Sequence, residues 1–316
     1  MLPSLPILTG PTASGKTALA LRVARELGLE IISADSRQVY AGLAVATAAP
    51  RDEERAQVRH HLVGHVAPGE AYSAGRFARE TRALLGLDAA PPPFLPFLVC
   101  GGSGFYLRAL LDPVPGLRAD PDLRDRVKQL AGSLEGEALR AEVLAGDPEA
   151  AWIPAADRTR LERYLEIRLA TGLPASRILR EQVRPRTLRP LIAVLDAPLA
   201  WLEERIGRRS SEMLEGGMVE EVRAALALGV PRGGPALRSV GVEEVEALLA
   251  GGLDLAGCAV RLTLRTRQLA KRQQTWLRGL ARREELLLLD ARRAEEELAG
   301  ELGAWWRRER AAVEGS

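Results

Sequence analysis

Short apolar runs alternate with segments of helical periodicity in the first hundred residues. Residues 5–9 (LPILT), 30–35 (EIISAD) and 93–100 (PFLPFLVC) are short and apolar, as buried strands are. Residues 17–28 (TALALRVARELG) have helical spacing and end on Gly28, a typical helix stop. Because strands that alternate with helices form parallel sheets covered on both faces, this pattern predicts an α/β fold.

The strand pattern stops near Pro113, and the segments PDLRDRVKQL, GEALRAEVLAG and DRTRLERYLEIRLATG predict helices instead. Residues 191–196 (LIAVLD) read as a strand again, and the chain after them reads as helical to its end. We therefore expect a core that is discontinuous in sequence and carries an all-helical insertion domain. The expected parts are the first part of the core (1–115), the helical insertion (116–187), the second part of the core with basic helices (188–290) and a C-terminal helical tail (291–316).

The composition is that of an ordinary globular protein, with 316 residues of which 47% are hydrophobic and 27% charged. No apolar stretch approaches the roughly 20 residues that span a bilayer, and the N-terminus reads as a strand rather than a signal peptide. We expect a cytoplasmic protein that contacts no membrane. Cys100 and Cys258 lie in apolar surroundings without paired or metal-binding spacing, so we expect buried thiols.

A formal charge of +2 hides a strongly basic stretch that contains no acidic residue between Leu255 and Arg283. A solvated helix normally interleaves glutamates for pairing, so this stretch favours a surface that binds a polyanion such as nucleic acid. The basic residues recur at near-helical spacing; they are Arg261, Arg265, Arg267, Lys271, Arg272, Arg278, Arg282 and Arg283.

GPTASGKT, residues 10–17, matches the phosphate-binding pattern G-x-x-x-x-G-K-[ST] between a predicted strand and a predicted helix. In such a P-loop, backbone N–H groups and the positive helix end hold phosphate oxygens, Lys16 supplies a charge, and Thr17 can ligate Mg²⁺. The core is thus predicted to be a P-loop core, with Mg²⁺ as its cofactor and Thr17 as the metal ligand. The residues expected to bind phosphates are Gly10, Pro11, Thr12, Ala13, Ser14, Gly15, Lys16 and Thr17.

DSRQVY, residues 35–40, follows the second predicted strand, and GGSG, residues 101–104, follows the third. Ligands of parallel sheets bind at the carboxyl ends of the strands, so both segments are expected beside the P-loop. Asp35 and Ser36 could instead cap a short helix. A kinase or ATPase would need a strand-end aspartate for its magnesium, and Asp196 could serve, but Asp35 would then have no role.

Nine segments, in this order along the chain, resemble those of bacterial tRNA dimethylallyltransferases, also called tRNA isopentenyltransferases. The resemblance extends from Leu8 to about Arg278. It implies transfer of the dimethylallyl group of dimethylallyl diphosphate to the exocyclic amine of the adenosine 3′ of the tRNA anticodon, with release of pyrophosphate. The segments are GPTASGKT, DSRQVY, HHL, YSAGRFARE, GGSGFYLRALL, DPEAAWIPAADRTRLERYLEIRLATGLP, EMLEGGMVEEVRAAL, RSVGVEEV and TRQLAKRQQTWLR.

By this resemblance the P-loop grips the diphosphate, and Asp35 accepts the proton of the amine. Ser36 and Gln38 would bond the adenine or its sugar-phosphate, and Arg37 would contact the RNA. Ser103 would position the amine, where family members usually have threonine. The residues expected to act in catalysis are Asp35, Thr17, Ser103, Arg205 and Arg209.

Arg205 and Arg209 stand four residues apart on one helix face, and the resemblance implies that one of them neutralises the diphosphate. The family more often has valine and aspartate where this chain has Ser210 and Ser211. A second departure is Ala49, where the family has lysine.

The anticodon stem-loop of tRNA is the expected macromolecular partner, and the chain is expected to be a monomer. Thr159 stands where the family usually has glutamine, and Arg267, Lys271 and Arg272 are expected along RNA phosphates. We expect His60, His61 and His65 to pack and to form hydrogen bonds, and Trp305 and Trp306 to form the apolar face of a terminal helix. The insertion residues expected to contact tRNA are Thr159, Arg160, Leu161, Glu162 and Arg163.

Three alternatives stay open at this point. One is an isopentenyltransferase that acts on free adenine nucleotides, although a small acceptor needs neither the insertion nor the basic helices. The others are a P-loop kinase that uses ATP and Asp196, and a non-enzymatic RNA-binding ATPase switch.

Overall fold

The computed structural model describes residues 2–87, 89–112, 121–181, 185–232 and 234–315. The chain forms two compact units, one of Met1–Leu111 with Thr187–Ser316 and one of Asp112–Arg186. We call the first the core unit and the second the insertion unit. The expected boundary between residues 115 and 116 lies outside the described residues, and the expected boundary at 187 falls next to Arg186.

The core unit is built on one parallel sheet, which in the described residues has six strands in the order β3-β2-β4-β1-β5-β6. Four strands were expected, and the structure confirms them as β1, β2, β4 and β5. The bounds are Ser4–Thr9 (β1), Glu30–Ser33 (β2), His60–His61 (β3), Phe97–Cys100 (β4), Arg189–Asp196 (β5) and Leu286–Asp290 (β6).

The expectation that the chain is helical from residue 197 to its end is wrong at β6. LLLLD has no polar face at helical spacing, and it pairs in parallel with β5 so that Asp290 lies opposite Asp196. Leu289 is buried beneath the terminal helix, whereas Leu288 is exposed on the other face of this edge strand. Pairing along β5 therefore decides the structure of a segment whose own pattern is ambiguous.

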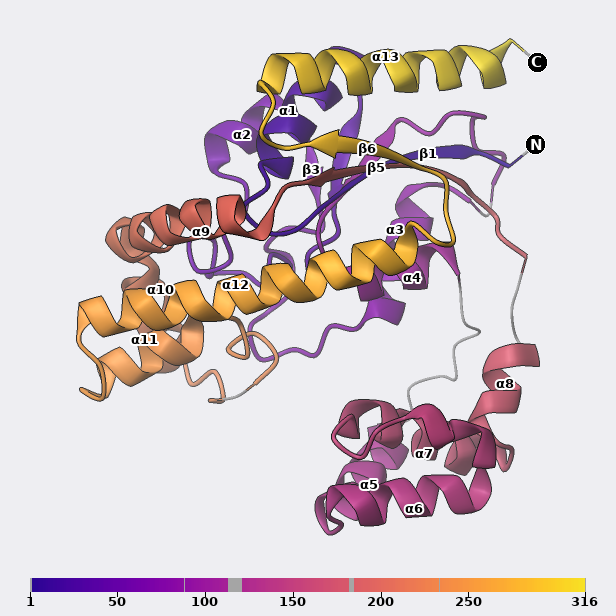
Figure 1. The fold of residues 1–316 in the computed structure, drawn as a ribbon, viewed down its shortest axis with the longest axis vertical. Coiled ribbons are helices and arrows are strands. Elements are labelled where there is room, and N and C mark those ends of the chain that lie inside the picture. The colour runs from indigo at the N-terminus through magenta and orange to yellow at the C-terminus, as the bar shows by residue number, and fades with distance from the viewer. Residues whose placement is uncertain (1, 88, 113–120, 182–184, 233, 316) are drawn as a thin grey trace. The chain divides into compact units, whose positions relative to one another are not determined.

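Helices cover both faces of the sheet, as expected, because neighbouring strand residues point to opposite faces. Ile7 packs with α3, α4 and α12 in one apolar cluster, whereas Leu8 packs with α1 and α13 in another. Figure 1 shows α1 and α13 together on one side of the sheet and α3, α4 and α12 on the other. The bounds are Lys16–Leu27 (α1), Asp52–Gln57 (α2), Ala74–Leu84 (α3), Gly104–Leu111 (α4), Leu199–Met213 (α9), Leu214–Met218 (η2), Val219–Ala227 (α10), Val242–Leu249 (α11), Leu255–Leu280 (α12) and Glu295–Glu314 (α13).

The insertion unit is helical wherever the structure describes it and has an apolar core of its own. Leu161 is fully buried in that core. None of the helices described in either unit combines the length and hydropathy that a membrane crossing requires. The insertion helices are Pro121–Gly132 (α5), Gly136–Gly146 (α6), Pro148–Trp152 (η1), Arg158–Thr171 (α7) and Ala175–Glu181 (α8).

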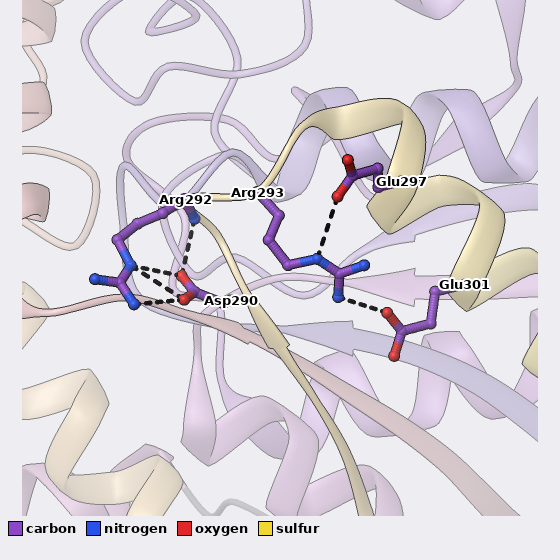
Figure 2. A network of polar contacts seen from close by, with 5 residues as sticks. All are labelled: Asp290, Arg292, Arg293, Glu297 and Glu301. Carbon is purple, nitrogen blue, oxygen red and sulfur yellow. Dashed lines mark hydrogen bonds and ion pairs between the residues drawn. The ribbon is translucent and has the colours of Figure 1, made fainter.

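The terminal helix α13 is a layer of the core unit, because its apolar face packs on α1. Figure 2 shows the exposed ion pairs at its start, where Arg292 contacts Asp290 at 2.6 Å and Arg293 contacts Glu301 at 2.6 Å. Exposed pairs of this kind contribute little to stability, because water screens their charges. Burial of Trp306, which is fully inaccessible, is therefore the larger stabilising contribution.

Replacing Trp306 by alanine is expected to lower the free energy of unfolding by about 3–5 kcal/mol, the usual cost of truncating a buried tryptophan. Trp305→Ala is the matched control, because Trp305 is only partly buried against the same cluster. Urea denaturation of both variants checks this. Equal losses would mean that α13 does not depend on the packing of Trp306.

Candidate active site

A cavity of about 660 Å³ lies at the carboxyl ends of β1, β2 and β4, where parallel sheets bind their ligands. All of its lining residues belong to the core unit. The predicted site residues that line it are Thr12, Lys16, Thr17, Asp35, Ser36, Arg37, Gln38, Ser103, Arg209 and Arg272.

The P-loop is shaped by a close approach to β5. A Cβ atom on Gly10 would lie 2.1 Å from the carbonyl oxygen of Leu195, so only glycine fits there. Gly15 caps α1 with a positive φ of 96°, which favours glycine. Within the described part of the chain, the backbone N–H groups of Ala13 and Gly15 bond to no protein acceptor, and the same holds for Lys16 and Thr17. Open N–H groups at a helix N-terminus form an anion site.

Lys16 places a buried ammonium group beside these N–H groups. Its Nζ donates to the carbonyl of Pro11 at 2.6 Å and to the hydroxyl of Ser14 at 3.5 Å. Burial, together with the positive charge of Arg209, lowers the pKa of Lys16 to about 8, although Cys100 and two carboxylates oppose the shift. A bound anion would favour the charged form of this lysine.

The two arginines of α9 have different surroundings. Arg209 lines the cavity, its Nη1 lies 3.5 Å from Oγ1 of Thr12, and burial lowers the pKa of its guanidinium. Arg205 instead donates from Nε to the carbonyl of Ala13 at 2.8 Å and stacks on the ring of Trp201 at 4.7 Å. Arg209 is therefore placed to meet an anion, and Arg205 to hold the loop.

The serines that follow Arg209 do not replace the missing acid. The hydroxyl of Ser210 donates to the carbonyl of Ile206 at 2.8 Å, and that of Ser211 donates to Gly207 at 3.5 Å. Both hydroxyls are thus used inside α9, and Arg209 has no ion pair among the described residues.

The turn after β2 presents Asp35 to the cavity with one oxygen committed and one open. Oδ1 accepts from the backbone N–H of Arg37 at 2.8 Å and of Gln38 at 3.4 Å, while no described group donates to Oδ2. Residues 36–39 form a turn and no helix begins there, so the alternative in which Asp35 and Ser36 cap a short helix is wrong. Ser103 joins this turn, because its Oγ accepts from the N–H of Ser36 at 3.0 Å.

Gln38 and Arg37 are already bonded within the protein. The amide of Gln38 accepts from Ser33 Oγ at 2.8 Å and donates to the carbonyl of Ala48 at 3.0 Å. Nη1 of Arg37 donates to the carbonyl of Pro235 at 2.7 Å. Gln38 thus shapes the cavity wall beside Ala48 instead of offering a free amide.

The basic helix α12 receives its carboxylate partners from other helices. Arg267 Nε lies 2.7 Å from Glu203 of α9, and Arg265 Nη1 lies 3.0 Å from the buried Glu244 of α11. Sequence spacing cannot reveal such partners, since they come from distant segments. Lys271 and Arg272 are exposed and have no ion pair in the described structure, so they remain available to a polyanion.

The insertion residues expected to contact tRNA lie in the other unit. Arg160 pairs with Asp157 at 2.7 Å and stacks on Trp152 at 5.0 Å, and Arg163 pairs with Glu166 at 2.8 Å. The remaining residues of this group differ in exposure, with Thr159 exposed, Glu162 half-buried and Leu161 buried.

The structure also shows site residues that the sequence reasoning missed. Gln273 of α12 accepts from the N–H of Thr12 at 2.8 Å and donates to the carbonyl of Gly102 at 3.1 Å. Phe105 lines the cavity although it is 78% exposed. The ring of Trp276 packs so closely on Gly104 that no side chain fits there. The segment TRQLAKRQQTW contains both Gln273 and Trp276, but only its basic residues entered the sequence-based prediction.

Asp196, His61 and His65 are engaged outside the cavity, whereas His60 lies in its lining with Nδ1 2.7 Å from the carbonyl of Val58. Oδ1 of Asp196 accepts from Gln274 Nε2 and from the N–H of Ala197, both at 2.8 Å, and Asp196 does not line the cavity. His61 contacts Glu30 at 2.5 Å, and His65 contacts Glu80 at 3.2 Å. Searching the described residues reveals no group of three potential metal ligands.

The lowered pKa of Lys16 predicts that pyrophosphate binding weakens as the pH rises through about 8. Only the protonated lysine attracts the anion, so from about pH 7 to about pH 9 the affinity of the parent relative to Lys16→Met should fall about tenfold. Taking this ratio cancels the titration of pyrophosphate itself. Calorimetry at a series of pH values checks it, and a constant ratio would show that Lys16 keeps its charge throughout.

Two sequence-family models match the chain. The one described as IPP transferase matches residues 38–280, and the one described as isopentenyl transferase matches residues 3–65. The chain is 43% identical over 279 residues to the tRNA dimethylallyltransferase of Anaeromyxobacter sp. (strain Fw109-5), covering 86% of this chain and 90% of that one. It is 39% identical over 282 residues to that of Rhizobium meliloti (strain 1021), covering 86% and 91%.

Solved structures give the same result. The tRNA isopentenylpyrophosphate transferase of Bacillus halodurans superposes with a TM-score of 0.68 at 27% identity and covers 99% of both chains. A eukaryotic dimethylallyltransferase acting on tRNA superposes with a TM-score of 0.76 at 25% identity and covers 92% of this chain and 74% of its own. These similarities confirm the resemblance and the expected fold class, and the chain belongs to the tRNA dimethylallyltransferase family.

Proposed function

We propose that this chain transfers the dimethylallyl group of dimethylallyl diphosphate to the exocyclic amine of the adenosine 3′ of the tRNA anticodon, releasing pyrophosphate. The observation that carries the proposal is that one cavity joins the open N–H groups of the P-loop to the free carboxylate oxygen of Asp35. The relatives named tRNA dimethylallyltransferases support the same reaction.

The diphosphate binds at the N-terminus of α1. Lys16 and Thr17, whose backbone N–H groups are open, line the cavity there together with Arg209. Arg205 supports this site from behind by fixing the carbonyl of Ala13. Such preorganised donors favour the charge that develops on the leaving diphosphate.

Magnesium fits this site through Thr17. Its side chain lines the cavity at the exposed start of α1, and Mg²⁺ is commonly held by substrate phosphates with only one or two protein ligands. Thr17 and the diphosphate oxygens would hold the ion, which would supply additional neutralisation of the diphosphate charge.

The transfer exchanges one bond for another. The carbon–oxygen bond to the diphosphate breaks and leaves its electron pair on oxygen, while the amine nitrogen of adenine forms the new carbon–nitrogen bond. The nitrogen then carries a proton that has become acidic, and Oδ2 of Asp35 accepts it. Ser103, which is tied to Ser36, orients the amine from the same side.

The adenosine must leave its stack to reach the cavity, which costs little in an anticodon loop. Phe105, exposed on the cavity wall, offers an aromatic face on which a base stacks. The exposed Lys271 and Arg272 contact RNA phosphates, and Arg160 and Arg163 of the insertion unit contact the anticodon stem-loop. We also propose that the chain acts as a monomer in the cytoplasm.

A kinase that uses Asp196 is less well supported, because that carboxylate is bonded to Gln274 and stands outside the cavity lining. An enzyme for free adenine nucleotides would have no use for the insertion unit. An ATPase switch would give the free carboxylate oxygen of Asp35 no proton to accept.

The proposed function is tested by incubating the protein with radiolabelled dimethylallyl diphosphate, Mg²⁺ and bulk tRNA, and in parallel reactions with AMP or ATP in place of the tRNA. We expect label in the tRNA and stoichiometric release of pyrophosphate. Label in adenine nucleotides but not in tRNA would support the free-nucleotide alternative. Hydrolysis of ATP without any prenyl transfer would support the kinase or the switch.

Replacing Asp35 by asparagine removes the base while nearly preserving its shape. We expect substrate binding within about threefold of the parent and a loss of about 10² or more in single-turnover rate. Asp196→Asn is the matched control, and it should retain most of the rate if it folds. An active Asp35→Asn together with a folded but inactive Asp196→Asn would reject the assignment of the base.

The affinity for tRNA should fall steeply with salt, because Lys271 and Arg272 bind phosphates. Each phosphate contact contributes about 0.7 to the slope of log affinity against log salt on single strands. Replacing both residues by alanine should therefore flatten that slope by about 1.4. Replacing Arg267, which Glu203 already neutralises, should change it less. An unchanged slope in the double variant would place this surface away from the RNA.

A further inference from the structure

Gln273 occupies a position that the reaction chemistry does not itself explain. It lies in the middle of α12, yet its amide reaches two different strand-end turns. Oε1 accepts from the N–H of Thr12 in the P-loop at 2.8 Å, and Nε2 donates to the carbonyl of Gly102 after β4 at 3.1 Å. The fit is close, because a Cβ atom on Gly102 would lie 2.4 Å from that Nε2.

We infer that Gln273 is a positioning residue that fixes the distance between the diphosphate site and the acceptor site. The inference rests on the proposed transfer reaction. Gln273 lines the cavity, but the role we assign to it acts through its two hydrogen bonds, which are both made to backbone groups of the protein.

At the diphosphate side, Gln273 holds the loop without using the anion donors. It takes the N–H group of Thr12, whereas those of Ala13, Gly15 and Lys16 stay open. The side chain of Thr12 also contacts Arg209 at 3.5 Å. Fixing Thr12 therefore fixes the start of the loop and one contact of the diphosphate-facing arginine.

At the acceptor side, a short series of contacts links Gln273 to the proposed base. Gly102 is followed by Ser103, whose hydroxyl accepts from the N–H of Ser36. Ser36 in turn directly follows Asp35 in the chain. A shift of Gly102 would therefore move Ser103 and the turn that carries the carboxylate.

The helix that bears Gln273 is well anchored for this task. Trp276, one turn further along α12, packs against Gly104 so tightly that a Cβ there would lie 2.3 Å from its ring. Gln273 also directly follows Lys271 and Arg272, which we propose contact RNA. The helix that holds the two turns is thus also the helix that receives the polyanion.

Replacing Gln273 by alanine should affect the chemical step more than binding. A misplacement of about 1 Å between reacting groups can lower the rate by about 10²-fold. We therefore expect the single-turnover rate at saturating substrates to fall by about tenfold or more. The Kd for pyrophosphate should stay within about threefold, because the open N–H groups and Lys16 remain. Gln273→Glu keeps the acceptor for Thr12 but replaces the donor to Gly102 by an oxygen and adds a negative charge beside the diphosphate site, so its rate should fall at least as far as that of Gln273→Ala.

Gln274→Ala is the matched control. Gln274 is the neighbouring glutamine, and its Nε2 donates to Asp196 and to the carbonyl of Ala197, both at 2.8 Å, outside the cavity lining. Gln274→Ala also removes two hydrogen bonds of a side-chain amide, so we expect a decrease in melting temperature but a rate close to that of the parent.

A parental rate for Gln273→Ala, or an equal loss of rate in Gln274→Ala, would overturn the positioning role. If Gln273→Ala does not fold, Gln273→Glu decides in its place, because a parental rate in that variant would overturn the role as well. A parent protein that transfers no label to tRNA would instead refute the proposed function, so the two failures are distinguishable.

Discussion

The parallel pairing of β1 with β4 and of β4 with β2 brings together the P-loop, Asp35 and Ser103. These strands end at one edge of the sheet, where the N–H of Gly101 bonds the carbonyl of Leu8 at 3.1 Å and the N–H of Ala34 bonds Cys100 at 2.8 Å. Three turns that are far apart in sequence therefore begin at the same edge. One turn brings anion donors, the second a carboxylate and the third a hydroxyl.

This edge concentrates positive charge where water is scarce. Burial lowers the pKa of both Lys16 and Arg209, and the positive charge of Arg209 lowers the pKa of Lys16 further. Such a site is costly without a ligand, because charge is buried with incomplete compensation. Binding of an anion compensates the buried positive charge. Part of the affinity for the anion therefore comes from the unfavourable free energy of the site without a ligand.

The P-loop, Asp35 and Ser103 could be predicted from the sequence because each depends on a local motif and on a general rule of parallel sheets. The bonds of Gln38 and Gln273 could not, since their partners are set by the tertiary fold. Arg267 illustrates the same limit, because its partner Glu203 lies 64 residues away in the chain. The prediction of a helix at β6 was wrong for a related reason, because the conformation of its four leucines is decided by pairing with β5.

The insertion unit begins and ends at an ion pair, in which Arg186 Nη2 lies 2.8 Å from Asp112 Oδ1. A segment whose two ends meet closes on itself with little additional loss of chain entropy, and it carries its own apolar core. It is therefore an insertion that can be exchanged as one segment. Exchange of the whole segment between relatives would leave β4, α4 and β5 continuous, so the insertion unit could diverge while the cavity at the sheet edge stayed constant.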